Sequence, residues 1–263
     1  MIGSSRLREK WQAGEATLGA WAALPGAFGA ELMCAAGIDY VCVDQQHGLI
    51  DYSDMVEMLR AIEGRGAVAL TRVPANEAWL IAKSLDAGAS GVIVPMVGNR
   101  AEAETAVRAC RYPPHGIRSY GPVRSTLVMN SREPSVLGSG TLCFVMVETR
   151  EGLEKIEEIA STPGLDGIYI GPADLALGLG LPPDLDKNEP EHVAAVAAIL
   201  ASCRKHGIVP GIQCGNGSAA LRCVEQGFGL VTFTKDSAIL QAGVERELSQ
   251  ARGKGAAAPR GYT

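Results

Sequence analysis

Several side chains suited to metal and acid–base chemistry stand where short apolar runs of this sequence end. Asp44 and His47 end one run, Arg72 ends the next, Glu148 ends a later one, and Asp174 follows another. If the runs are parallel strands, their carboxyl ends meet at one rim, where barrel enzymes hold their catalytic groups. Three carboxylates, one guanidinium and one imidazole at such a rim indicate a metal-assisted reaction of an oxygen-rich substrate.

Glu148 and Asp174 are the candidate metal ligands. Two carboxylates on neighbouring strand ends repel each other unless a proton, an arginine or a metal lies between them. No Cys–His cluster stands nearby in the sequence, so the ligands are oxygens. That favours Mg²⁺ or Mn²⁺ over Zn²⁺, with Co²⁺ as a further candidate. The alternative is structural: Glu148 would form a salt bridge with Arg72, and Asp174 would only cap a helix.

Arg72 and His47 are the candidate catalytic residues. The forked guanidinium of Arg72 suits a carboxylate or an enolate oxygen, although a buried arginine can equally belong to a structural ion pair. His47 is the only histidine at a predicted strand end. Beside Asp44 it suits a general base, and the alternative is a histidine with purely structural hydrogen bonds. Lys235, directly after the last predicted strand, is a rival candidate as a Schiff-base lysine.

These side chains act together only if the segments between them bring the strand ends to one place. Eight short, almost continuous apolar runs alternate with amphipathic helical patterns, which is typical of parallel strands covered on both faces. The predicted strands are Leu18–Ala23, Tyr40–Asp44, Ala67–Arg72, Gly91–Pro95, Leu142–Glu148, Gly167–Gly171, Ile208–Ile212 and Leu230–Thr234. The pattern predicts an α/β fold with a single (β/α)8 TIM barrel over residues 1–251. An open doubly wound sheet is the alternative, and residues 252–263 are predicted to be a disordered tail.

The composition excludes several classes of protein. The chain has 263 residues, close to the usual length of such a barrel, and its net charge of −5 argues against a nucleic-acid partner. Residues 1–10 lack the apolar stretch of a secretory signal, and the window Leu18–Ala30 is too short to span a bilayer. Seven scattered cysteines without a C-x-x-C pair favour reduced thiols and a cytoplasmic location.

With these residues in place, the sequence resembles the class II pyruvate-dependent hydroxyketoacid aldolases, the 4-hydroxy-2-oxoheptanedioate aldolase type of the aldolase/citrate lyase superfamily. The resemblance extends from about Trp11 to Leu248 and rests on five motifs in the same order. The motifs are Val43–His47, Val94–Val97, Arg111–Arg118, Val147–Glu151 and Asp166–Leu175.

The resemblance implies a role for each candidate residue. Glu148 and Asp174 match the metal ligands, and Arg72 matches the arginine that steadies the keto and enolate oxygen. His47 matches the histidine in proton transfer, with Asp44 as the acidic residue beside it. The substrate-binding positions implied are Gln46, Arg72, Met146, Gly171, Pro172, Ala173, Asp174 and Ile212.

The resemblance also implies how subunits assemble. The family's barrel exchanges its C-terminal helix with a neighbour, which implies domain-swapped dimers and homohexamers built as trimers of dimers. Asp86 matches an aspartate that the neighbouring subunit contributes in support of the histidine.

Two positions depart from the family's pattern. Many members have Glu where this chain has Gln46, and Gln where it has Met146. Gln46 cannot carry a charge, and Met146 cannot donate a hydrogen bond to a carboxylate. The choice between pyruvate and hydroxypyruvate as the donor therefore stays open.

The expected activity is the cleavage or formation of 4-hydroxy-2-oxo acids from a 2-oxo acid and an aldehyde. A citrate-lyase-β-like acyl-CoA lyase would share the metal site, but the sequence contains no dedicated basic or Gly-rich CoA site. A class I aldolase would use Lys235 without a metal. A catalytically inert barrel that acts as a binding protein is the alternative outside enzymes.

Overall fold

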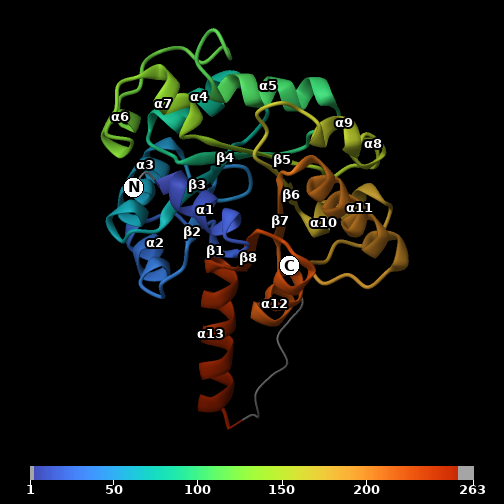
Figure 1. The fold of residues 1–263 in the computed structure, drawn as a ribbon. Helices are drawn as coiled ribbons and strands as arrows, with labels where there is room; N and C mark the ends of the chain where they lie inside the picture. Colours follow the sequence, from blue (N-terminus) through green and yellow to red (C-terminus); the bar gives the residue numbers. More distant parts are fainter. Residues whose placement is uncertain (1–2, 254–263) are drawn as a thin grey trace.

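A closed barrel of eight parallel strands forms the centre of the protein (Figure 1). The computed structural model describes residues 3–253, and in it each strand pairs with the next along the chain while β8 pairs with β1. The strands are β1 (Thr17–Ala22), β2 (Tyr40–Asp44), β3 (Val68–Arg72), β4 (Gly91–Val94), β5 (Leu142–Met146), β6 (Gly167–Ile170), β7 (Val209–Gln213) and β8 (Leu230–Lys235). The (β/α)8 prediction is therefore confirmed, each strand end lies within two residues of its predicted place, and the open sheet is excluded.

Helices precede and follow the strands, and all except α13 surround the barrel (Figure 1). They are α1 (Gly3–Gln12), α2 (Ala27–Cys34), α3 (Tyr52–Gly64), α4 (Ala78–Asp86), α5 (Arg100–Cys110), α6 (Ser125–Val128), α7 (Pro134–Ser139), α8 (Arg150–Glu154), α9 (Ile156–Ala160), α10 (Pro172–Gly178), α11 (Pro190–His206), α12 (Gly217–Gln226) and α13 (Asp236–Ala251). No helix in the described part of the chain is long and apolar enough to cross a membrane.

Alternate residues of each strand face the inside of the barrel, because side chains of a strand point to opposite sides in turn. The inward set forms one apolar cluster that includes Leu7 of α1, and the outward set packs under the helices as a second, larger cluster. Tyr40 and Tyr169 both hydrogen-bond to the Thr232 hydroxyl, at 2.8 and 2.7 Å. The interior is therefore filled, and the space left for a substrate is at the mouth formed by the strands' carboxyl ends.

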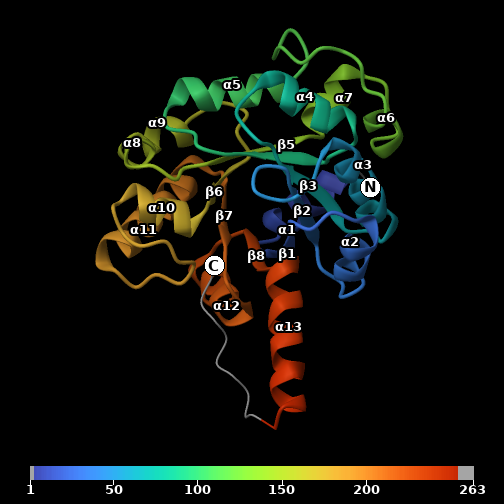
Figure 2. The same cartoon turned by 180° about the vertical axis from the view of Figure 1, so that it is seen from behind.

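Helix α13 does not pack against the barrel as the other long helices do. It projects away from the barrel (Figures 1 and 2), and none of its residues is buried. Its first residue, Asp236, is fixed by the backbone N–H groups of Ala23 and Leu24, at 3.0 and 2.9 Å. The predicted disordered tail lies, from residue 254 onward, outside the described residues.

Candidate active site

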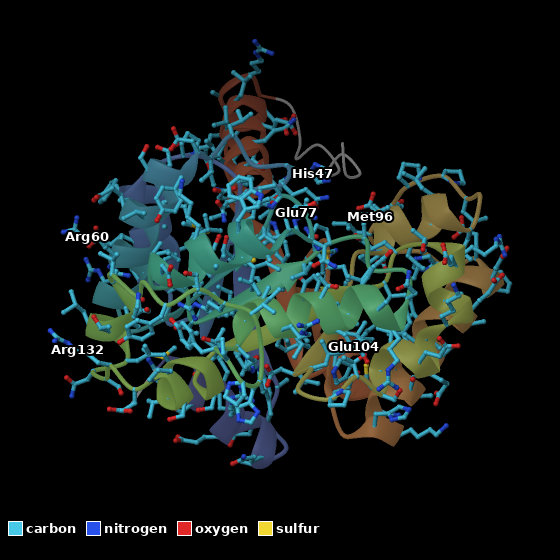
Figure 3. All side chains as sticks on the ribbon, turned by 90° about the horizontal axis from the view of Figure 1, so that it is seen from above. His47, Arg60, Glu77, Met96, Glu104 and Arg132 are labelled. Carbon is cyan, nitrogen blue, oxygen red and sulfur yellow. The ribbon has the colours of Figure 1, made fainter. Side chains whose placement is uncertain are left out.

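The predicted polar residues meet at the carboxyl-terminal mouth of the barrel. Asp44 and Arg72 are the last residues of β2 and β3, and Glu148 follows β5 by two positions. All three occupy inward positions, in step with the inward-facing Cys42, Leu70 and Met146. In Figure 3 the labelled His47 and Met96 lie on the side of the molecule from which α13 projects.

Arg72 and Asp44 form a buried, two-pronged ion pair. The Nε and Nη2 atoms of Arg72 donate to the two carboxylate oxygens of Asp44 at 2.9 and 2.7 Å. The side chains are 7% and 3% exposed. Burial alone would raise the pKa of Asp44, but the hydrogen bonds and charge of Arg72 hold it below its ordinary value. The indole ring of Trp21 lies 5.1 Å beneath the guanidinium carbon, so the guanidinium is held in one orientation.

This geometry decides one of the alternatives raised by the sequence. Arg72 does take part in an ion pair, but its partner is Asp44 and not Glu148. Asp44 also accepts the backbone N–H groups of Gln46 and His47, at 3.1 and 3.3 Å. Asp44 therefore orients both the arginine and the loop that carries the histidine.

Glu148 is buried close to a second carboxylate. Burial and the neighbouring Asp174 together raise the pKa of Glu148 to about 7, against the lowering effects of a hydrogen bond from the Met96 backbone and the charge of Arg72. The Met96 N–H donates to Oε2 of Glu148 at 3.1 Å. A Cβ atom built on Gly171 would lie 2.7 Å from Oε1 of Glu148. The carboxylate thus rests directly on the backbone of Gly171, and only glycine leaves room for it there.

Glu148 and Asp174 fit a divalent cation. The pKa of Glu148 is raised because its negative charge is buried beside a second carboxylate. A bound cation would stabilise both negative charges and lower that pKa again. Among residues 3–253, no group of three or more His, Cys, Asp and Glu side chains is arranged to hold a metal ion. Two carboxylates with the remaining positions open are what Mg²⁺ and related ions use when substrate and water complete their coordination.

The start of α10 lies beside this pair. Asp174 is in the first turn of the helix and is not its N-cap, because Gly171 occupies that position. The first backbone hydrogen bond of α10 runs from the N–H of Leu175 to the carbonyl oxygen of Gly171, at 3.0 Å. The N–H groups of Ala173 and Asp174 therefore point out of the helix end, where backbone donors bind anions.

His47 and Asp86 are not brought together within one subunit. His47 is exposed at the mouth, and the carboxylate of Asp86, at the end of α4, binds Nη2 of Arg118 at 2.7 Å. A role of Asp86 beside His47 stays a prediction that needs a second copy of the chain. Gln46 is partly buried, and its Oε1 atom is buried without a hydrogen-bond partner.

The seventh strand contributes a residue that the sequence analysis passed over. Ile212 packs with the outward-facing residues under the helices. β7 extends one residue further than predicted, to Gln213, and alternation puts that side chain on the inward side. The register that pairs Tyr169 of β6 with Gly211 of β7 fixes this alternation, so the side chain of Ile212 points away from the barrel interior and Gln213 is the better candidate for a substrate contact.

Two other contributors could not be found from sequence. Met96 has a left-handed backbone (φ 57°), which turns its N–H toward Glu148, and nothing about a methionine predicts that conformation. His192 of α11 is buried, and its Nε2 lies 3.0 Å from the carbonyl oxygen of Pro172, to which it donates. This contact ties the first residue of α10 to the next helix.

Fold and site together define a barrel protein with its polar groups at the carboxyl-terminal mouth, the arrangement of barrel enzymes. The chain belongs to the HpcH/HpaI aldolase/citrate lyase family, whose sequence pattern matches residues 18–237. The family predicted from the motifs is therefore confirmed.

Individual relatives agree along almost their whole length. The chain is 40% identical over 248 residues to the hydroxypyruvate/pyruvate aldolase of Rhizorhabdus wittichii, covering 94% of this chain and 99% of that protein. It is 33% identical to the 4-hydroxy-2-oxo-heptane-1,7-dioate aldolase of Klebsiella pneumoniae, covering 92% of each. Among solved structures, a family member from Burkholderia cenocepacia superimposes with a TM-score of 0.86 at 32% identity, covering 95% of this chain and 98% of that one.

Proposed function

We propose that this protein is a metal-dependent class II aldolase that cleaves or forms 4-hydroxy-2-oxo acids, with pyruvate or hydroxypyruvate as the donor. The observation that carries the proposal is the mouth of the barrel. There a buried, oriented Arg72–Asp44 pair lies close to the Glu148–Asp174 carboxylates. The names of the relatives from Rhizorhabdus wittichii and Klebsiella pneumoniae support the same chemistry.

Glu148 and Asp174 would hold the divalent cation, with Mg²⁺, Mn²⁺ and Co²⁺ as candidates. When bound, the cation supplies a Lewis acid for the oxygens of the 2-oxo acid. The chain's own contribution is to keep the first carboxylate in place, because Met96 N–H holds one oxygen of Glu148 and Gly171 leaves space for the other.

Arg72 would bind the keto oxygen of the donor and stabilise the negative charge that develops there. Its Nε and Nη2 atoms donate to Asp44, so the N–H groups of Nη1 are left for the substrate. A hydrogen-bond donor that is held in one orientation before the reaction stabilises the developing charge without further reorganisation. The backbone N–H groups of Ala173 and Asp174 would hold the donor's carboxylate, with Gly171 and Pro172 shaping that end of the site.

His47 would move the proton to or from the 4-hydroxyl, directly or through water. Its backbone is fixed by Asp44 while its imidazole lies exposed at the mouth. Asp86 of a neighbouring subunit would support it. Gln46 would lie beside the substrate without adding a charge to the site, and Met146 would contribute the apolar wall under Glu148.

The assembly we propose is a homo-oligomer with exchanged C-terminal helices, built as dimers that associate into hexamers. Its support is the apolar stripe on α13, where Leu240, Val244 and Leu248 recur every fourth residue and are all exposed. Exposed Phe28 and Leu32 on α2 offer an apolar surface on the barrel itself. The cytoplasmic location remains a proposal, supported by the seven free thiols of the structure.

The test is pyruvate release from 4-hydroxy-2-oxo acids by protein stripped with EDTA, with and without added Mg²⁺, Mn²⁺ or Co²⁺. We expect activity to disappear on chelation and to return with metal. Activity that survives chelation, together with trapping of Lys235 by borohydride in the presence of pyruvate, would replace the proposal by a class I mechanism. Cleavage of CoA thioesters alone would assign an acyl-CoA lyase, and a chain without metal binding or turnover would be an inert barrel.

A further inference from the structure

Two cysteines outside the proposed active site lie side by side where β7 meets α12. Cys214 is the first residue after β7, and Cys223 lies in the second half of α12. Their sulfur atoms are 3.6 Å apart, with the Cys214 thiol directed at the sulfur of Cys223. Cys214 packs with the outward-facing residues of the barrel and Cys223 packs against the same cluster, so neither thiol faces the barrel mouth.

The surroundings of the pair make one thiol accessible and reactive. Both cysteines line a cavity of about 600 Å³ between α11 and α12. Cys214 is buried, whereas Cys223 is partly exposed, so a reagent in the cavity meets Cys223 first. The hydrogen bond from Cys214 lowers the pKa of Cys223 against the effect of burial, and the charge of Arg222 lowers it further. A thiolate is the form of cysteine that attacks disulfides.

We propose that Cys214 and Cys223 are a reversible dithiol–disulfide pair, oxidised by exchange with a low-molecular-weight disulfide such as oxidised glutathione. The Cys223 thiolate attacks one glutathione sulfur, forms a mixed disulfide and releases the first glutathione as a thiolate. Cys214 then loses its proton, attacks the sulfur of Cys223 and releases the second glutathione. Overall, two protein thiols are oxidised to one disulfide, and one glutathione disulfide is reduced to two glutathione thiols, so electrons and protons balance.

The local structure permits the bond to form. A disulfide needs its sulfurs about 2.05 Å apart, so the two must approach by roughly 1.5 Å. Helix α12 buries only Ala219 and Ala220, and a small shift of such a lightly anchored helix supplies the approach. The exposed Leu221 lies about 200° around the helix from Cys223. A neighbouring subunit packed on Leu221 would therefore leave the two cysteines accessible to glutathione.

The experiment uses the intact protein, reduced with dithiothreitol, desalted and incubated with oxidised glutathione. Free thiols are then alkylated under denaturing conditions, and the protein is digested with trypsin without reduction. Because trypsin cleaves after Arg222, the proposal predicts that peptides 206–222 and 223–235 are joined, with the loss of two hydrogen atoms. Dithiothreitol should separate them again. Cys110 and Cys143 are fully buried and should remain alkylated thiols, which serves as an internal control.

Two variants make the outcome specific. Cys223→Ser should abolish the joined peptides, whereas Cys34→Ser, which removes a buried cysteine on α2, should leave them unchanged. Glutathione retained on Cys223 while Cys214 is alkylated would overturn the proposal, because it would show a single reactive thiol. Alkylation of both cysteines after prolonged exposure to oxidised glutathione would overturn it as well.

Discussion

Arg72 forms a structural ion pair with Asp44 and is proposed to act in catalysis, and a substitution should separate the two roles. Arg72→Ala would leave the buried carboxylate of Asp44 without its cation, which destabilises a protein by about 3–5 kcal/mol. Arg72→Lys keeps the charge but loses the planar fork. We expect it to lower kcat by about 10²–10³-fold, because a positioned donor to the developing oxyanion is lost. The KM for the 2-oxo acid should change much less, as steady-state kinetics would show.

Urea unfolding of the same variant gives the structural part. Arg72→Lys should lose about 1–3 kcal/mol, the cost of a poorly satisfied buried pair. A variant with unchanged kcat and reduced stability would show that Arg72 only balances Asp44, and the catalytic role would have to be abandoned.

Gly171 is predicted to be essential because of the position of Glu148. A methyl group at Gly171 would lie 2.7 Å from Oε1 of Glu148 and 3.0 Å from Cε of Met146, so Gly171→Ala should push the carboxylate aside. We expect metal affinity, measured by calorimetry, to fall by about tenfold or more. Gly64→Ala is the matched control, since nothing lies within 4 Å of its added methyl group. Unchanged metal affinity in Gly171→Ala would mean that Glu148 is not a ligand.

The pKa of Glu148 predicts how the stability of the metal-free protein depends on pH. The folded pKa of about 7 lies above the ordinary 4.5, so the folded chain keeps a proton that the unfolded chain has lost. Its contribution to stability is complete below about pH 4.5 and is lost as the pH rises to about 7. Across this window the wild type should lose about 3 kcal/mol more than Glu148→Gln, which cannot titrate.

Urea unfolding at several pH values, with a chelator present, checks this difference. Added metal should offset the loss at the upper end of the window, because it binds the deprotonated carboxylate. If the free energies of unfolding of wild type and Glu148→Gln change with pH in parallel, Glu148 titrates at its ordinary pKa, and its burial beside Asp174 does not make stability depend on pH.

At the scale of elements, the sequence was sufficient to predict where strands run but not what their ends contact. Continuous apolar runs mark strands covered on both faces, so all eight could be predicted. The same runs hide which residues face inward, because both faces are apolar. The sequence therefore favours Ile212 as a substrate contact, whereas in the structure Gln213 holds the inward position.

Contacts between elements were the harder part of the site to predict. The pairing of Arg72 with Asp44 depends on the register of β2 against β3, which sets the two residues opposite each other. The turn of Met96 toward Glu148 depends on a left-handed backbone that only the packed barrel imposes. The polar residues at the strand ends can therefore be predicted from the sequence. Their ion-pair and hydrogen-bond partners cannot, because these depend on how neighbouring strands align in the folded barrel.

The junction of α10 and α11 offers a prediction about positioning. His192 donates to the carbonyl oxygen of Pro172 at 3.0 Å and thereby fixes the end of α10 that carries Ala173 and Asp174. His192→Ala should cost about 1–2 kcal/mol of stability through the lost hydrogen bond and packing. If that helix end binds the donor's carboxylate, the KM for the 2-oxo acid should rise more than kcat falls.

The control for this junction is His206→Ala, which removes an imidazole paired with Glu157 on the surface. It should leave both kinetic constants unchanged. A His192→Ala enzyme with lower stability but normal KM would show that the helix end is rigid without the contact.

At the scale of the whole molecule, the exposed apolar residues of α13 are the main support for the proposed assembly. A single barrel leaves Leu240, Val244 and Leu248 of this helix exposed, and leaves Phe28 and Leu32 of α2 uncovered. Contiguous exposed apolar surfaces of this kind mark sites of protein association. The neighbour's Asp86 would also reach the mouth only in an oligomer, so assembly and activity are predicted to depend on each other.

The combined substitution Leu240→Asp and Val244→Asp tests that dependence, because it places two charges in the apolar stripe of α13. We expect light scattering after gel filtration to show the mass fall to that of one 27.5 kDa chain, with loss of aldolase activity because Asp86 no longer reaches a neighbour's His47. Ala242→Asp adds a charge at an exposed position about 200° around the same helix from Val244, away from the apolar stripe, and should change neither mass nor activity. A monomer that retains full activity would place the whole catalytic apparatus in one chain and remove Asp86 from it. An unchanged oligomer would instead show that surfaces other than α13 hold the subunits together.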